Sequence, residues 1–416
     1  MPKVSIPLIV FLYLFLFNPP FLIFSGNLHF GNLFSLLALI LFVSRPQVVM
    51  TFIKSYKSEF LWVLYLLLFA FLRSGVEGDT PVITQHIIAF INIFIIVPFI
   101  INFIRKKTCN GNQYLIRCLL IVGAIGSIVT LLCFLSPSFN QFSKQVLMQY
   151  SSAELNNEMN DYRGYGFASL LSSDYGFTMG ILLVMGCFYY KNNKWFLLFM
   201  PLVFLAALVN ARTGLVIALT GILVFFIYNR NYKFSLVLLL ISFIIYQNTE
   251  KLLSLLNFNE NTLMWLTYEF ESASDAIRSG DMSQSLTLTA LFSDFWIMPD
   301  NIEQWIFGRG FDLYRNTHGV HPSDVGWIRE LNYGGLLYLI PLICLIWTMF
   351  RRLIKLNNKA IALFFLLTVC IINTKTMVFP GDRSFYILVL IYTMITMRTK
   401  HVASITSVQY GKVECV

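Results

Sequence analysis

The stretch VITQHIIAFINIFIIVPFIINFIRKK (82–107) decides the fold. Its residues 82–104 carry no charged side chain, and three basic residues, Arg105, Lys106 and Lys107, follow at once. About 20 consecutive apolar residues are enough to cross a bilayer as a helix, and basic residues collect at the cytoplasmic end of such a helix. The stretch therefore predicts a membrane-spanning helix that ends on the cytoplasmic side.

The composition of the whole chain extends this pattern. Of the 416 residues, 57% are hydrophobic and 12% are charged, whereas a soluble domain has about 25% charged residues. These values exclude a soluble globular protein, a disordered chain and a coiled coil. The seven cysteines lie in or beside apolar stretches or in the tail, which argues against a disulfide framework and a cysteine-based metal site.

Apolar stretches recur along the chain and predict an all-α polytopic membrane protein with about twelve spans. The first stretch has no small-residue cleavage site, so we expect a retained signal-anchor. We expect about nine spans over 1–247, a large structured outer loop over 248–330, three last spans over 331–397 and a cytoplasmic tail over 398–416. The twelve predicted spans are 5–24, 28–44, 60–72, 82–104, 115–135, 167–190, 195–209, 213–228, 234–247, 331–350, 360–378 and 384–397, with a further outer loop near 136–166.

The basic residues predict the orientation of these spans. The net charge of +9 is spread in small groups between apolar stretches, which indicates membrane topology rather than binding to nucleic acid. With a cytoplasmic N-terminus, every short inner loop is basic, and Glu59 and Glu414 are the only acidic residues on the inner side. The loops 136–166 and 248–330 then face outward, and long structured loops often carry function.

Arg212 is an unusual outer arginine. It lies in NARTGL (210–215), between two apolar stretches with almost no loop. A charge at the membrane boundary is costly and by default suggests a functional site, and the planar guanidinium suits bidentate contact with phosphate. The alternative is a snorkelling arginine or a structural ion pair.

A second candidate group lies in GRGFDLYRNTHGVHPSDVGWIRE (308–330), directly before a predicted span. A histidine beside a carboxylate acts as a general base, which favours His321 with Asp324, or His318 in its place. The spacing of these three residues also permits a metal site, although Pro322 breaks any regular helix there. Two surface histidines without a role are the remaining alternative.

Further basic residues lie at other outer junctions. Arg163 precedes one span, and Lys375 and Arg383 lie between the last two spans. Asp174 is expected about two helical turns into its span, buried and in need of a partner. Together with Arg309 and Arg329, these basic residues could line one cavity for an anionic ligand at the outer leaflet.

The pattern resembles the O-antigen and capsule repeat-unit polymerases (the Wzy type) and the related O-antigen ligases. The resemblance rests on the Arg-Thr-Gly junction at 212–214, on IMPDNIEQWIFGRGF (297–311) and on HPSDVGWIRELNYGGLLYLI (321–340). NTKT (373–376) and the later Arg383 are also similar to the polymerases. The resemblance covers the whole architecture, although each motif is short.

The resemblance implies a glycosyltransferase of the C-type fold in the bacterial inner membrane, with its active site facing the periplasm. Its substrates would be oligosaccharide repeats on undecaprenyl pyrophosphate, and it would need no metal, cofactor or nucleotide sugar. Undecaprenyl-linked units, membrane lipid, a chain-length regulator and a flippase are the expected partners. The implied pyrophosphate ligand is Arg212, with Arg163, Arg309, Arg329, Lys375 and Arg383 around it, and the implied base is His321, oriented by Asp324, with His318 as substitute.

Two other functions remain open. An O-antigen ligase uses the same lipid-linked donor but transfers to lipid A–core, so its chemistry would involve the same residues. A flippase or exporter of lipid-linked sugar belongs to another class and tends to show two related halves, which this sequence lacks. The polymerase is the favoured interpretation.

The orientation can be tested with reporter fusions. We expect alkaline phosphatase fused after Asp300 to be active, because the basic inner loops place 248–330 in the periplasm. We expect green fluorescent protein fused after Lys400 to fluoresce in the cytoplasm. An inactive phosphatase fusion at Asp300 would contradict the orientation and move the candidate site to the cytoplasm.

Overall fold

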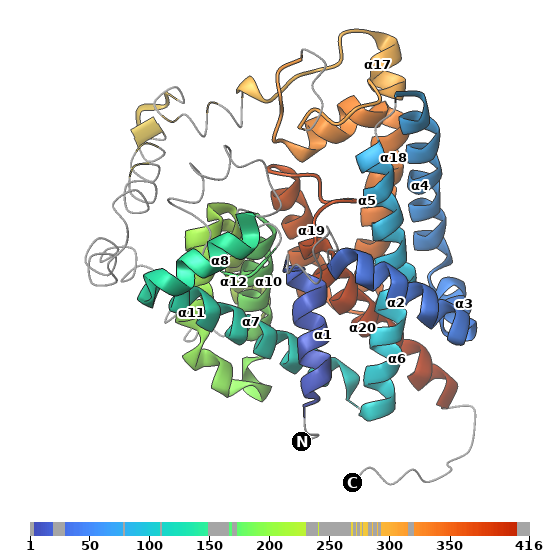
Figure 1. Cartoon of the computed structure of the whole chain (residues 1–416). Helices are drawn as coiled ribbons and strands as arrows, with labels where there is room; N and C mark the ends of the chain where they lie inside the picture. The colour runs from blue at the N-terminus through green and yellow to red at the C-terminus, as the bar shows by residue number, and fades with distance from the viewer. Residues whose placement is uncertain are drawn as a thin grey trace.

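The computed structural model describes residues 4–19, 30–77, 80–108, 110–148, 166–168, 173–229, 293–314 and 320–405, with scattered positions between 240 and 289. Within these residues the chain is helical and contains no strand (Figure 1). The N-terminal half consists of α1 (Ile6–Phe17), α2 (Phe30–Ser44), α3 (Pro46–Ser55), α4 (Lys57–Glu77), α5 (Thr80–Ile91), the π-helical turn η1 (Asn92–Ile96), α6 (Val97–Lys107), α7 (Gly111–Leu135), α8 (Pro137–Met148) and α10 (Asp174–Phe188). The C-terminal half consists of η2 (Tyr190–Asn192), η3 (Lys194–Leu198), α11 (Met200–Asn210), α12 (Arg212–Asn229), α17 (Ile302–Phe307), α18 (Gly326–Lys355), α19 (Lys359–Asn373) and α20 (Ser384–Ile405).

Three of the described helices are long and apolar enough to cross a membrane: Pro81–Lys107, Gly111–Cys133 and Gly326–Lys355. A bent pair, Leu36–Ser44 with Pro46–Ser55, passes the same test as one unit. The all-helical, apolar character expected from the sequence is therefore confirmed. Eleven predicted spans overlap a described helix, the span 234–247 lies outside the described residues except for Leu240, and the number twelve stays a prediction.

Two stretches differ from the sequence prediction. Residues 46–55, expected in an inner loop, form α3, which turns by 93° from α2. The turn follows from Pro46, because proline is accepted in the first turn of a helix but cannot continue the helix before it. Residues 137–148, expected in an outer loop, form α8.

The helices give the bundle two different ends. One end holds the junctions 210–212, 308–326 and 374–384, and we call it the loop end; α17 and the start of α18 mark it at the top of Figure 1. Here the Arg73 guanidinium, near the end of α4, donates to the Gly308 carbonyl at 2.8 Å. The opposite end holds Lys54, Lys57, Arg105, Lys106 and Lys107, and we call it the basic end.

Small residues bring α10 and α12 into close contact. Gly176 and Gly180 form a GxxxG pair on α10, and a Cβ atom at Gly180 would collide with the Gly214 carbonyl oxygen. A Cβ at Gly176 would lie 2.5 Å from the Ala211 Cβ. Such pairs let two backbones approach closely in apolar surroundings, where packing replaces the hydrophobic effect. The contact fixes the Arg212 junction against the start of α10.

The turn GRGF (308–311) forms hydrogen bonds with a kink in α18. Gly335 interrupts the helix with φ 61°, which frees the carbonyl groups before it. The Arg309 and Gly310 N–H groups donate to the carbonyls of Asn332 and Tyr333. Gly308 and Gly310 themselves have φ values of 73° and 90°, a region that side chains disfavour. The glycines therefore let this loop segment pair with the opened helix.

The α10–α12 contact can be tested with matched substitutions. We expect Gly180→Ala to lower the free energy of unfolding by about 1–3 kcal/mol, because the new methyl group meets a backbone oxygen that cannot move aside. Gly123→Ala is the control, since its Cβ would meet the flexible Leu182 side chain at 3.1 Å. The measurement is thermal or denaturant unfolding in detergent, and equal stability of the two variants would contradict the contact.

Candidate functional site

The connection between α19 and α20 carries a buried aspartate, Asp382, and a partly buried arginine, Arg383, at the loop end. The Arg383 backbone N–H donates to Asp174 Oδ2 at 3.4 Å, and the Arg383 guanidinium donates to the Phe15 carbonyl at 3.2 Å. Asp382 Oδ1 accepts from the Ser384 backbone N–H at 2.8 Å and from the Ser384 hydroxyl, which caps the start of α20. Asp174, Asp382 and Ser384 are all buried.

Asp174 lies at the first residue of α10, not two turns into the helix as expected. The predicted burial and the predicted need for a partner are confirmed, since Asp174 is 6% exposed and accepts from Arg383. Ala211, directly before Arg212, packs on Gly176 in the first turn of α10, so the Arg212 junction lies at the same end of α10 as Asp174. We call Asp174, Asp382 and Arg383 the arginine–aspartate cluster, and Arg212 lies at the same end of the bundle.

Asp382 is the member of this cluster that sequence reasoning missed. Burial, and next the neighbouring Asp174 charge, raise the pKa of Asp382 well above its usual range. Its Oδ2 atom is buried and has no hydrogen-bond partner in the described structure. The sequence signal was the run PGDRS (380–384), where an aspartate stands beside the arginine directly before a predicted span.

A second group of polar residues surrounds the start of α18. Asp324 pairs with Lys375, which joins the 320–325 segment to the connection after α19. Asn373 donates to Glu330 Oε2 at 2.9 Å and accepts from the Val378 N–H at 2.7 Å. Glu330 is fully buried, and its Oε1 atom has no hydrogen-bond partner among the described residues. The connection 374–383 therefore contributes Lys375 to this second polar group and Asp382 and Arg383 to the arginine–aspartate cluster.

His321 and Asp324 do not form the expected pair. The Nδ1 atom of His321 lies 2.9 Å from the Pro322 carbonyl oxygen, and Asp324 instead binds Lys375. The imidazole is exposed and lies near the Phe295 ring, with 6.3 Å between the ring centroids. The orienting role expected for Asp324 is therefore corrected, because the lysine amine offers this carboxylate a full opposite charge.

Two of the predicted helper arginines also have carboxylate partners. Arg329 forms a bidentate pair with buried Asp312, with N–O distances of 2.7 and 2.6 Å, and lies over the Tyr314 ring. Arg309 lies 3.0 Å from Asp300, which is 68% exposed, and donates to Asn332 Oδ1 at 2.9 Å. Their positive charge is therefore neutralised within the loop end.

Some predicted site residues are not covered. Arg163 and His318 lie outside the described residues. Among the residues that are described, no group of three His, Cys, Asp or Glu side chains is placed to hold a metal ion. The metal alternative at 318–324 involves His318 and stays untested.

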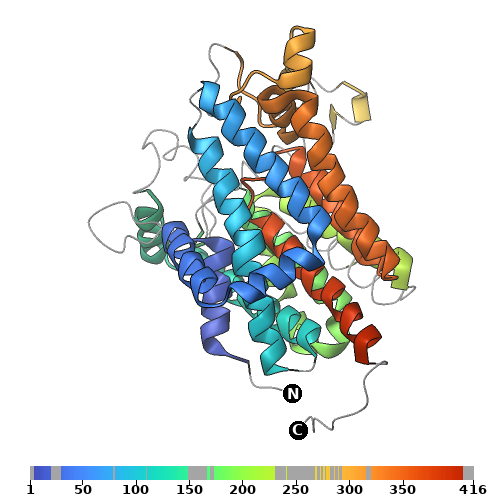
Figure 2. The ribbon, with the colours of Figure 1, turned by 90° about the vertical axis from the view of Figure 1, so that its right-hand side faces the viewer.

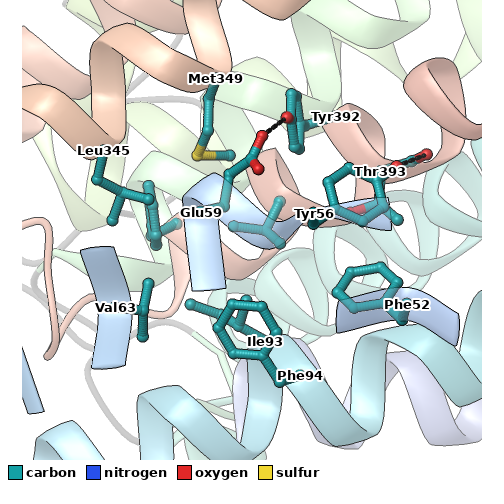
Figure 3. Close-up of a pocket in the computed structure, with 12 residues that line it drawn as sticks. Phe52, Tyr56, Glu59, Val63, Ile93, Phe94, Leu345, Met349, Tyr392 and Thr393 are labelled. Atoms are coloured by element: carbon teal, nitrogen blue, oxygen red, sulfur yellow. Dashed lines mark hydrogen bonds between the residues drawn. The ribbon is translucent and has the colours of Figure 1, made fainter. Parts of the chain in front are cut away.

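A separate buried carboxylate lies at the basic end (Figure 3). Glu59, on α4, accepts from the Tyr392 hydroxyl and lies 3.0 Å from Arg352. It borders a cavity of about 20 Å³ whose walls include Phe52 and Phe94. A cavity of this size holds about one water molecule, so the Glu59 group supports the packing of α4, α18 and α20 rather than a substrate.

The raised pKa of Asp382 predicts a pH-dependent stability. A carboxyl with a raised pKa in the folded state stabilises that state at low pH, and this contribution is lost as the pH rises from the ordinary carboxyl pKa of about 4 through the raised value. We expect the unfolding temperature of the wild type to fall over this window, and Asp382→Asn to fall less, because the amide cannot ionise. Asp294→Asn, at an exposed position, is the control. Parallel curves for Asp382→Asn and the wild type would contradict the burial of Asp382.

Comparison with known proteins does not assign the chain to a family. No protein-family model matches the chain, and no curated protein matches it. The functional argument therefore rests on the residues and the contacts given above.

Proposed function

We propose that the chain is a membrane-embedded glycosyltransferase that polymerises lipid-linked oligosaccharide repeat units into O-antigen or capsule polysaccharide. The observation that carries the proposal is the arginine–aspartate cluster at the end of an apolar helical bundle. Arg383 belongs to this cluster, Arg212 begins α12 at the same end of the bundle, and apolar α10 and α20 adjoin the cluster. This combination is what an anionic head group on a long isoprenoid chain requires.

The proposed reaction uses pyrophosphate as its leaving group. The acceptor hydroxyl oxygen bonds to the anomeric carbon of the growing chain, and the bond from that carbon to undecaprenyl pyrophosphate breaks. The electron pair leaves with the pyrophosphate, and the acceptor proton passes to a protein base. Arg212 and Arg383 stabilise the charge that develops on the leaving group, and a guanidinium acts more strongly in a buried, water-poor site. The step requires no metal and no nucleotide sugar.

His321 remains the proposed base. Its Nδ1 faces the Pro322 carbonyl, so the exposed Nε2 is the nitrogen that an acceptor hydroxyl reaches. The Asp324–Lys375 pair links the segment of His321 to the connection that ends in Arg383. We place the loop end in the periplasm and the basic end in the cytoplasm of a bacterial inner membrane, by the positive-inside rule.

The proposal is tested by Arg212→Lys. Lysine keeps the charge but loses the planar fork, so we expect polymer yield to fall about tenfold or more with normal protein level. Arg351→Lys, the same exchange at an exposed position of the basic end, is the control. The measurement is electrophoresis of surface polysaccharide from a deletion strain that carries each variant.

The deletion strain itself separates the alternatives. Loss of a polymerase leaves core with one repeat attached, whereas loss of a ligase or a flippase leaves core alone. Core without any repeat in the deletion strain would overturn the polymerase proposal. Full polymer from Arg212→Lys would show that Arg212 serves packing or topology only.

A further inference from the structure

A groove at the basic end lies between α3, α6 and the later part of α20. Its volume is about 260 Å³. Its polar walls are Gln47, Thr51, Asn102 and Arg105, and apolar Phe52 and Ile101 also line it. Figures 1 and 2 show α3 turning away from α2 and passing alongside α6. The groove is therefore far from the loop end and independent of the proposed transferase site.

Arg105 is held in place at this groove. It lies in the last turn of α6, and its Nη2 atom donates to the Met397 carbonyl at 2.9 Å. This bond ties the guanidinium to α20 across the groove. A guanidinium carries five N–H donors in a planar fork, which matches the oxygen atoms of a phosphate.

The charge around the groove is one-sided. The helices α3, α6 and α20 contain no aspartate or glutamate, and neither do residues 1–58 and 80–153 as a whole. Arg45 and Lys54 lie at the two ends of α3, and Lys106 and Lys107 follow Arg105. Glu59, on the neighbouring α4, already has Arg352 as its partner at 3.0 Å. The groove is therefore complementary to an anion.

The surrounding helices place this anion site at a membrane surface. In α3, Val49 and Phe52 are buried while Gln47 and Lys54 are exposed, so the helix is amphipathic. A short amphipathic helix with basic residues on its polar side is typical of the interface between lipid head groups and acyl chains. Basic pockets between helices on the cytoplasmic side of a membrane bind anionic head groups.

We propose that this groove binds the head group of an anionic phospholipid of the phosphatidylglycerol type. Arg105 contacts the phosphate, and the amides of Gln47 and Asn102 and the hydroxyl of Thr51 contact the glycerol hydroxyl groups. The acyl chains lie along the apolar side of the groove beside Phe52 and Ile101. The amide and hydroxyl groups favour a hydroxyl-bearing head group over one that ends in a cation, which the surrounding lysines repel.

The experiment measures lipid binding to the purified full-length protein by native mass spectrometry. Phosphatidylglycerol, phosphatidylcholine, undecaprenyl phosphate and inorganic phosphate are titrated separately. We expect phosphatidylglycerol to show the tightest binding that depends on Arg105, and Arg105→Gln to weaken it about fivefold, the effect of one basic residue near a lipid surface. Lys359→Gln, which removes an exposed charge outside the groove, is the control and should leave binding unchanged.

Two further variants separate the effect of the charge at the groove from the effect of its free volume. Thr51→Trp fills the groove without removing a charge and should also weaken phosphatidylglycerol binding, whereas Arg105→Lys should retain part of it. Equal losses in Arg105→Gln and Lys359→Gln would overturn the groove as the site. Equal binding of phosphatidylcholine would overturn the charge argument. Tighter binding of undecaprenyl phosphate or inorganic phosphate that is lost in Arg105→Gln would overturn the assignment to a phospholipid, whereas binding that Arg105→Gln leaves unchanged belongs to the loop end.

Discussion

Backbone N–H and C=O groups inside an apolar bundle have no water to bind, so each interruption of a helix must be paired within the protein. At the kink of α18, the freed carbonyls accept from the N–H groups of Arg309 and Gly310. In the connection after α19, the Asn373 side chain accepts from Val378. Both interruptions lie at the loop end. The need to pair backbone groups at these interruptions therefore also places polar side chains near the candidate site.

Because little water reaches the interior of the bundle, most charged side chains there pair with one another, and only the remaining charges can bind a ligand. A buried charge without a partner is costly, so Arg329 binds Asp312, and the partly exposed Lys375 and Asp324 also pair. Such pairs stiffen the loops but offer little net charge to an incoming anion. The basic end is built differently, because its helices α3, α6 and α20 contain no acidic residue. The positive charge of these helices is therefore not balanced by carboxylates of their own.

The sequence predicted the helices well and their contacts poorly. The apolar run 82–104 and the basic residues after it coincide with a helix that ends at Lys107, because length and hydropathy alone decide such an element. Helix α3 was missed because a short amphipathic helix has no long apolar run. The partner of Asp324 was missed because Lys375 lies 51 residues away, and spacing along the chain favoured nearby His321. Only the packing of α18 against the connection after α19 brings the carboxylate and the lysine together.

The arginine–aspartate cluster differs from the paired charges in one respect. Burial, and next the Asp174 charge, raise the pKa of Asp382, so this carboxyl binds a proton more readily than an exposed aspartate does. A protonated Asp382 leaves the Arg383 guanidinium less compensated, which favours an anion beside it. A pyrophosphate bound there would raise the pKa of Asp382 further and keep its proton in place. In the proposed reaction Asp382 would therefore keep its proton while the donor is bound, and for this reason the proposal assigns the base to His321.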